Sequence, residues 1–214
     1  MAKSPFLELV GLEAIENMER PGAIKTHLPF NRVPYSPQAK YIFVARNPYD
    51  CCVSFYHHTR AFPAYRFADG SFDTFLDKFL AGKVDCGDYF RQLLSCEEVI
   101  KIADFLGEKC GERLRSRPDI LERILDTISA KTMAAFNDEF RKWTEEAAAM
   151  TSSQGGEMDD NVKKPMTGDF VRKAIVGDWK NHFNSEQIKR MKERLTSKVQ
   201  GSSVMSLWEG VELP

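Results

Sequence analysis

The sequence predicts a single α/β domain over residues 1–214, with a parallel sheet and a helix-rich C-terminal half. Two short segments are typical of strands, AIKTHL at 23–28 and KYIFVAR at 40–46. The second segment is rich in β-branched and aromatic residues and almost wholly apolar, as expected for a strand buried on both faces of a parallel sheet. A length of 214 residues is enough for one domain with its own hydrophobic core.

Helices are predicted where the pattern of apolar residues changes. After Arg46 a helix should begin, because Asn47 is a good N-cap, Pro48 suits the first helical position and Asp50 falls in the first turn. Ser71 can cap a second helix over 72–82. The remaining helical patterns cover 88–106, 118–128, 131–150 and 185–199. The polar segment 151–168 contains Gly and Pro and predicts a mobile surface loop that is too near the end to separate a second domain.

Composition excludes several classes of function. With 30 basic and 31 acidic residues the net charge is −1, so no chain-wide field favours nucleic acid or an anionic membrane, and an anion site must be built locally. No apolar run reaches the length of a membrane span, and the acidic N-terminus does not resemble a signal peptide. The five cysteines have no metal-type spacing and predict free thiols in the cytoplasm. Neither they nor the histidines, His57, His58 and His182 among them, predict a metal site.

A first candidate site lies in YIFVARNPYDCCVSF at 41–55. Arg46 ends the predicted buried strand, at the sheet edge where ligands of open α/β folds bind. The helix that follows offers unpaired N–H groups to an anion, and Ser54 leans back toward its N-terminus. An arginine fork and a hydroxyl would together hold a phosphate. The alternative is that Arg46 pairs with Asp50 and Ser54 only packs.

A second candidate lies in RKAIVGDWKNHF at 172–183. Arg172 and Lys173 are adjacent cations whose repulsion a shared anion would relieve. The alternative is a solvated basic pair. Gly177 permits a tight turn, and Trp179 is expected to be a packing anchor.

A third candidate is His27, at the end of the predicted strand in AIKTHLPF at 23–30. A histidine in this position can act as a general base near pH 7, and the two-residue period of a strand places Lys25 on the same face. The alternative is an ordinary surface or core histidine. Five aromatic residues either line an apolar acceptor pocket or belong to the core, namely Phe62, Tyr65, Phe67, Tyr89 and Phe90.

Taken together, these segments resemble the cytosolic sulfotransferase family. The likeness is carried, in order, by KTHLP at 25–29, YIFVARNPYDCCVSFYH at 41–57, VIKIADFLG at 99–107 and RKAIVGDWKNHF at 172–183. The resemblance implies a three-layer fold like that of P-loop NTPases, with a parallel sheet flanked by helices. It also implies transfer of a sulfo group from 3′-phosphoadenosine 5′-phosphosulfate (PAPS) to a hydroxyl or amine of a small acceptor. No metal is implied.

The resemblance also assigns roles to residues. His27 would take the acceptor proton and Lys25 would stabilise charge on the sulfonate. The 3′-phosphate would be held by Arg46, Ser54, Arg172 and Lys173, and the nucleotide would be bordered by Ser129 and Met133 of ISAKTM at 128–133. In that motif Ile128 and Ala130 depart from the family pattern. Ala174 stands where the family has glycine.

Three family features have no counterpart in the sequence. These are the P-K-S-G-T-T-W loop that wraps the 5′-phosphosulfate, a strand near Ser95 and Cys96 with an adenine-contacting tyrosine, and the dimer segment after Trp179. At that dimer segment Lys180 is followed by Asn184, Ser185 and Lys189, so dimerisation by this route is not expected.

The missing features predict an incomplete or alternatively spliced member that lacks part of the sheet, folds poorly and transfers sulfo groups slowly. The alternative is a non-catalytic homologue that binds adenosine 3′,5′-bisphosphate (PAP) weakly or acts through partners. A nucleotide kinase is not favoured, because the sequence has no G-x-x-x-x-G-K-[ST] loop.

Overall fold

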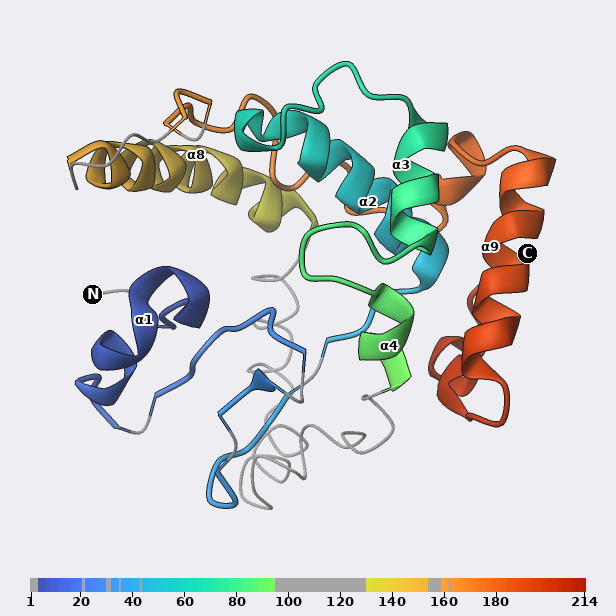
Figure 1. The fold of residues 1–214 in the computed structure, drawn as a ribbon, viewed down its shortest axis with the longest axis horizontal. Coiled ribbons are helices and arrows are strands. Elements are labelled where there is room, and N and C mark those ends of the chain that lie inside the picture. Colours follow the sequence, from blue (N-terminus) through green and yellow to red (C-terminus); the bar gives the residue numbers. More distant parts are fainter. Residues whose placement is uncertain are drawn as a thin grey trace.

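The computed structural model describes residues 4–20, 22–29, 32–34, 36–42, 44–94, 130–153, 159–161 and 163–214. Its helices are α1 (Leu7–Glu16), α2 (Pro48–Ala61), α3 (Phe72–Leu80), α4 (Tyr89–Leu94), α8 (Ala130–Ser153) and α9 (Ser185–Val199). The described residues also form the short 3₁₀ helices η2 (Pro63–Tyr65), η4 (Asp178–Asn181) and η5 (Val204–Trp208). Figure 1 shows α8 beside α2, with α3 and α9 following on one side of α2 and α1 set apart near the N-terminus.

The helices begin where the sequence predicts. The side chain of Asn47 accepts a hydrogen bond from the Asp50 N–H at 2.9 Å and caps α2, and Pro48 is the first helical residue. Ser71 caps α3 in the same way by accepting from the Thr74 N–H at 3.1 Å. Helix α9 covers the predicted range 185–199. None of the helices in the described ranges is long and apolar enough to cross a membrane.

The core forms where α2, α3, α4 and α9 meet. Tyr49 of α2 is 1% exposed and its ring lies 5.3 Å from that of Trp179 and 5.5 Å from that of Phe183. Trp179 is therefore the packing anchor that its sequence context predicts. Arg190 of α9 donates to Asp73 of α3 at 3.0 Å, which fastens the outer helix to the same core.

The prediction of two strands is wrong for the described residues. In the described residues neither 23–28 nor 40–46 belongs to a β ladder, and the pairing recorded is one parallel bridge between Phe6 and Lys25. A buried strand needs hydrogen-bonded neighbours on both sides. Ile42 is 49% exposed and Val44 is 86% exposed, so the apolar faces of this segment lack the cover that a central strand would have.

Several sequence predictions lie outside the described residues. They include the helix at 118–128, the motif at 99–107, the deletion near Ser95 and most of the predicted helix at 88–106, of which α4 is the described part. Helix α8 extends the predicted 131–150 by a few residues at its C-terminal end. Helix α1 is an element that the sequence analysis did not predict.

The carboxylate of Asp50 joins the two halves of the chain. It is 2% exposed and accepts hydrogen bonds from the Gly177 N–H at 2.8 Å and the Trp179 N–H at 3.0 Å, besides one from the Asn47 side chain at 2.8 Å. Gly177 has φ +90°, the left-handed conformation that glycine adopts without strain. The turn that starts η4 is thereby fixed to the first turn of α2, 127 residues away in sequence.

Replacing this carboxylate should destabilise the protein. Asp50→Ala removes the acceptor of three hydrogen bonds and leaves buried N–H groups unpaired, which we expect to lower the free energy of unfolding by about 3 kcal/mol. Asp69→Ala, in an exposed loop, is the matched control and should change it by less than about 0.5 kcal/mol. Urea denaturation measures both, and equal midpoints for the two variants would contradict this role of Asp50.

Candidate functional site

The predicted basic pair, Arg172 and Lys173, contacts the carboxylate of Asp178 in the same segment. Arg172 forms an ion pair with Asp178, and the Lys173 Nζ donates to the other oxygen of that carboxylate at 2.9 Å. Burial alone would raise the pKa of Asp178, but hydrogen bonds from Arg172, Lys173 and Asn181 hold this pKa well below its usual range. The two cations thus converge on one anionic group, which disfavours the alternative of a separately solvated pair.

The segment before these cations is fixed by α8. The Asn137 side chain donates to the Val171 carbonyl at 3.0 Å and accepts from the Val171 N–H at 2.7 Å. With Asp50 holding Gly177, Arg172 is therefore positioned from both sides. Helices α2 and α8 are distant in sequence, and both hold the short segment that contains Arg172 and Lys173.

The other half of the predicted phosphate clamp is on α2. Ser54 is half-buried and follows Asp50 by one turn, with His57 three residues further on, so the three share one face of the helix. Asp50 contacts Gly177, and the pKa of His57 responds to the charges of Arg172 and Asp178. Ser54 therefore lies on the face of α2 that meets the basic segment.

Arg46 precedes α2 and is exposed. Its carbonyl accepts a hydrogen bond from the Tyr89 hydroxyl, which ties the start of α2 to α4. The alternative of an Arg46–Asp50 pair is not what the structure shows, because the partners of Asp50 are Asn47, Gly177 and Trp179. Within the described ranges no carboxylate pairs with the Arg46 guanidinium.

Two histidines to which the sequence assigned no role pack beside this region. The rings of His57 and His182 lie 5.0 Å apart, and the Nε2 of His182 is 3.5 Å from the Asp178 carboxylate. Burial, together with the positive charge of Arg172, lowers the pKa of His57 to about 4. Burial also lowers the pKa of His182, so both rings are neutral near pH 7 and do not compete with Arg172 for an anion.

The predicted general base is positioned by α1. The Glu8 carboxylate accepts hydrogen bonds from the His27 N–H and, at 3.0 Å, from the Thr26 hydroxyl. The His27 ring lies 4.9 Å from the Phe6 ring, and the Lys25 Nζ lies 5.0 Å from the same ring. Lys25 and His27 therefore both pack against Phe6.

The surroundings of His27 favour the neutral imidazole, which is the form that can accept a proton. Partial burial and the nearby charge of Lys25 lower its pKa, although the carboxylates of Glu8 and Asp85 oppose this shift. The pKa of His58 is lowered by burial and is also affected by the charges of Asp85 and His27. Sequence reasoning did not find Glu8, His58 or Asp85, since no motif links residues so far apart.

Other predicted residues divide between the core and the vicinity of His58. Phe90 is fully buried in the core, and Phe67 is partly buried against it. Phe62 and Tyr65 lie beside the His58 ring, at 4.5 and 6.2 Å. Met133 falls within α8, whose side chain at that position is not described, and Ser129 lies outside the described residues.

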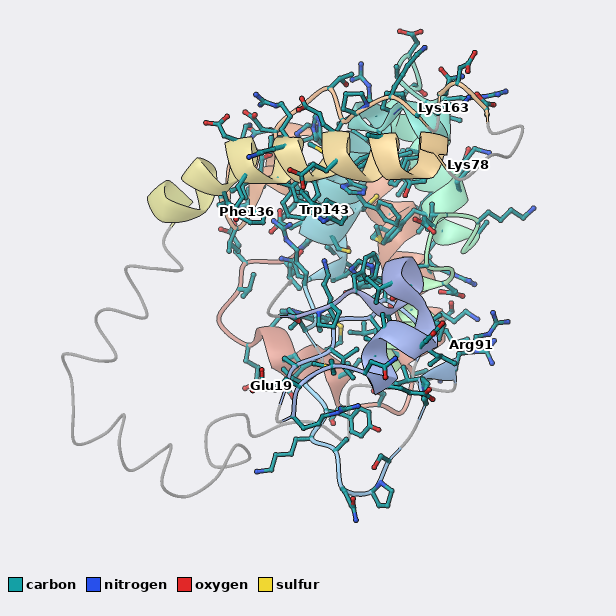
Figure 2. All side chains as sticks on the ribbon, turned by 90° about the vertical axis from the view of Figure 1, so that its left-hand side faces the viewer. Glu19, Lys78, Arg91, Phe136, Trp143 and Lys163 are labelled. Atoms are coloured by element: carbon teal, nitrogen blue, oxygen red, sulfur yellow. The ribbon has the colours of Figure 1, made fainter. Side chains whose placement is uncertain are left out.

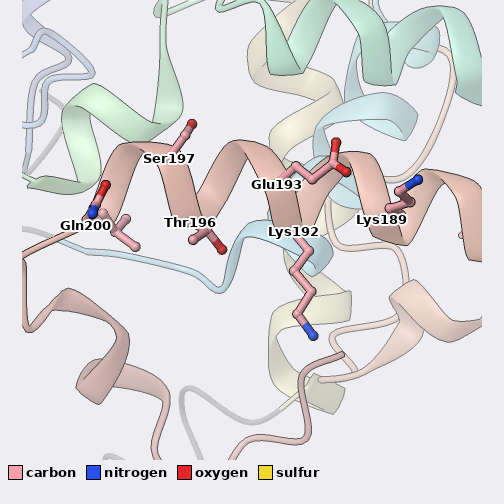
Figure 3. A pocket seen from close by; sticks show the side chains of 7 residues that line it. Lys189, Lys192, Glu193, Thr196, Ser197 and Gln200 are labelled. Carbon is pink, nitrogen blue, oxygen red and sulfur yellow. The ribbon is translucent and has the colours of Figure 1, made fainter.

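Figure 3 shows a surface hollow that we do not take as the site. It is lined by residues of one helix and its end, Lys189, Lys192, Glu193, Thr196, Ser197, Val199 and Gln200. A ligand site needs polar groups that converge from several elements. None of the predicted site residues borders this hollow. In the described part of the chain no group of three or more His, Cys, Asp or Glu residues could hold a metal ion.

Ala174 has φ +51°, in the left-handed region. A side chain in this conformation costs roughly 1–2 kcal/mol, which glycine avoids. We expect Ala174→Gly to raise the free energy of unfolding by about 1 kcal/mol, partly offset by the greater freedom of glycine in the unfolded chain. Ala64→Gly in η2, an exposed position without positive φ, should give no gain. A loss of stability in Ala174→Gly, measured by urea denaturation, would contradict the strain argument.

Comparison with known proteins identifies the family of the chain. The family model described as the sulfotransferase domain matches residues 1–98 and 95–203. The chain is 31% identical over 223 residues to sulfotransferase 1 family member D1 of Mus musculus, covering 94% of this chain and 71% of that protein. It is 28% identical over 234 residues to human sulfotransferase 1C2, covering 94% of this chain and 72% of that protein.

A solved structure supports the same assignment at the level of the fold. Mouse sulfotransferase SULT7A1, crystallised in complex with PAP, aligns with a TM-score of 0.57 and 23% sequence identity over 98% of this chain and 78% of that one. The predicted fold class is therefore confirmed. The chain belongs to the sulfotransferase family, as its sequence motifs predicted, and the activity of that family is sulfo transfer.

Proposed function

We propose that residues 1–214 form one domain that uses PAPS as co-substrate and transfers its sulfo group to a hydroxyl or amine of a small acceptor. The observation that carries this proposal is that Asp50, one turn before Ser54 on α2, accepts hydrogen bonds from Gly177 and Trp179, in the segment that follows Arg172 and Lys173. The PAP-bound relative supports the choice of nucleotide. A cytoplasmic location agrees with Cys51 and Cys52 being free thiols.

The 3′-phosphate is proposed to bind between these two segments. Arg172 and Lys173 both pair with the carboxylate of Asp178, so their charged groups lie close together before any nucleotide binds. Arg46 and the Ser54 hydroxyl would complete the clamp from the N-terminal side of α2. A dianionic phosphate with several charged hydrogen bonds is the kind of ligand this arrangement favours.

Ser129 and Met133 remain proposed neighbours of the nucleotide, on the basis of the family motif alone. Proximity of α8 to the basic segment supports this placement, because Asn137 of the same helix holds Val171. Figure 2 shows Phe136 and Trp143 along α8, and the Phe140 ring stacks on Phe170 at 4.0 Å. Helix α8 therefore contributes both to the basic segment and to the aromatic residues near His58.

His27 is proposed as the general base. The acceptor hydroxyl gives its proton to the neutral imidazole while its oxygen forms a bond to sulfur. The bond from that sulfur to the 5′-phosphate oxygen breaks, and PAP leaves with the electron pair. Lys25, held beside His27 by Phe6, would stabilise the negative charge on the sulfonate oxygens during this displacement.

Replacing His27 tests the function most simply. His27→Ala should reduce kcat by ~10²–10⁴-fold, because the proton acceptor is lost, while the Kd for PAP stays unchanged. In the parent protein kcat/KM should fall as the pH decreases, with a midpoint below the usual pKa of histidine, because burial and the charge of Lys25 lower the pKa of His27 and only the neutral ring accepts a proton. Sulfo transfer to a simple phenol from pH 5 to 8 measures both effects.

Three outcomes of this experiment separate the alternatives. If His27→Ala keeps most of the parent rate, His27 is structural and the proposed mechanism is wrong. If the parent binds PAP but gives no product with any acceptor, the non-catalytic alternative holds. If the parent binds no PAP, the proposed nucleotide site is wrong.

A further inference from the structure

Asp178 pairs with both cations of the basic segment in the proposed 3′-phosphate site. One oxygen of its carboxylate pairs with Arg172, and the other accepts a hydrogen bond from the Lys173 Nζ at 2.9 Å. The Asp178 side chain is only 6% exposed, so this contact is largely shielded from water. Phosphate oxygens accept the same charge-assisted hydrogen bonds from arginine and lysine. The carboxylate therefore engages these two cations in the way that a bound phosphate would.

The charge of this carboxylate opposes that of a phosphate. Burial acts against its ionisation, but hydrogen bonds from Arg172, Lys173 and Asn181 hold the pKa of Asp178 well below its usual range. The carboxylate is therefore ionised near pH 7. Two cations and one carboxylate leave a single net positive charge in this group. A dianionic phosphate must consequently either overcome repulsion from Asp178 or separate the carboxylate from its cations.

Other contacts keep the carboxylate near the site when its cations turn to a ligand. The Asn181 side chain donates to Asp178 Oδ1 at 2.9 Å, and the Nε2 of His182 lies 3.5 Å from Oδ2. The backbone beside Asp178 is also fixed, because the Trp179 N–H donates to the buried carboxylate of Asp50 at 3.0 Å. Asp178 therefore stays close to the two cations and can pair with them again when the ligand leaves.

We infer, resting on the proposed function, that the Asp178 carboxylate is an internal competitor of the 3′-phosphate. It occupies Arg172 and Lys173 in the empty site, gives way when PAPS binds and returns to the cations as PAP leaves. The competition lowers the apparent affinity for the nucleotide, because only the fraction of molecules with free cations binds it. It also assists the release of PAP after each turnover. A residue that only held the cations in place would act in the opposite direction, since its loss would weaken binding.

Removal of the charge tests this inference through the sign of its effect. Asp178→Asn keeps the size of the side chain and an acceptor oxygen for Asn181 but no longer neutralises the cations. Calorimetric titration of PAP into the full chain should give a Kd about fivefold lower than in the parent, and stopped-flow fluorescence should show slower dissociation. Asp178→Ser removes the carboxylate in a second way and takes its place if the asparagine variant does not fold. Asp69→Asn removes one charge from an exposed loop and should bind PAP like the parent.

The gain in affinity should depend on Arg172, because Asp178 acts by pairing with that side chain. In the Arg172→Ala background, Asp178→Asn should tighten PAP binding less than it does in the parent, which a double-mutant cycle measures. Unchanged or weaker binding by the variant without the carboxylate overturns the inference, and so does a gain that is equally large without Arg172. These results leave the proposed function intact, whereas a parent that binds no PAP overturns the proposed function and this inference with it.

Discussion

The site depends first on a buried carboxylate that links two distant parts of the chain. Asp50 accepts the N–H groups of Gly177 and Trp179 and is oriented by the Asn47 side chain. A buried charge is tolerated only when hydrogen bonds replace the water it has lost, and each of these three donors does so. The same bonds decide where Arg172 can lie relative to Ser54. Stability and the anion site therefore share one interaction.

The hydrogen bonds to Asp50 also fix the position of Asp178, the carboxylate that pairs with the two cations. Asp178, between the two N–H groups that Asp50 accepts, holds Arg172 and Lys173. Two adjacent cations would otherwise repel one another and disperse into solvent. By pairing with one carboxylate they stay together, and their charges are oriented before a phosphate arrives. This preorganisation costs some binding energy, because the phosphate must compete with Asp178 for the same donors.

Local signals in the sequence predicted much of this structure. The caps at Asn47 and Ser71, the range of α9 and the anchoring role of Trp179 are encoded within a few residues and are confirmed. The strands at 23–28 and 40–46 were wrong for the described residues, because strand formation depends on neighbours that a local pattern cannot reveal. Glu8 and Asp85 were not found either, since their side-chain partners are set by tertiary packing rather than by spacing. Asp178 was missed although its partners Arg172 and Lys173 belong to the same segment.

The central proposal is that Arg46 and Arg172, which are far apart in the sequence, bind the same phosphate. Calorimetric titration of PAP into the parent, Arg46→Ala, Arg172→Ala and the double variant tests it directly. Each single change should weaken binding at least about tenfold, and the double variant should lose less than the sum, because the two residues share a ligand group. Lys83→Ala removes a charge elsewhere and should bind PAP like the parent. A parent-like Kd for either arginine variant would contradict the account.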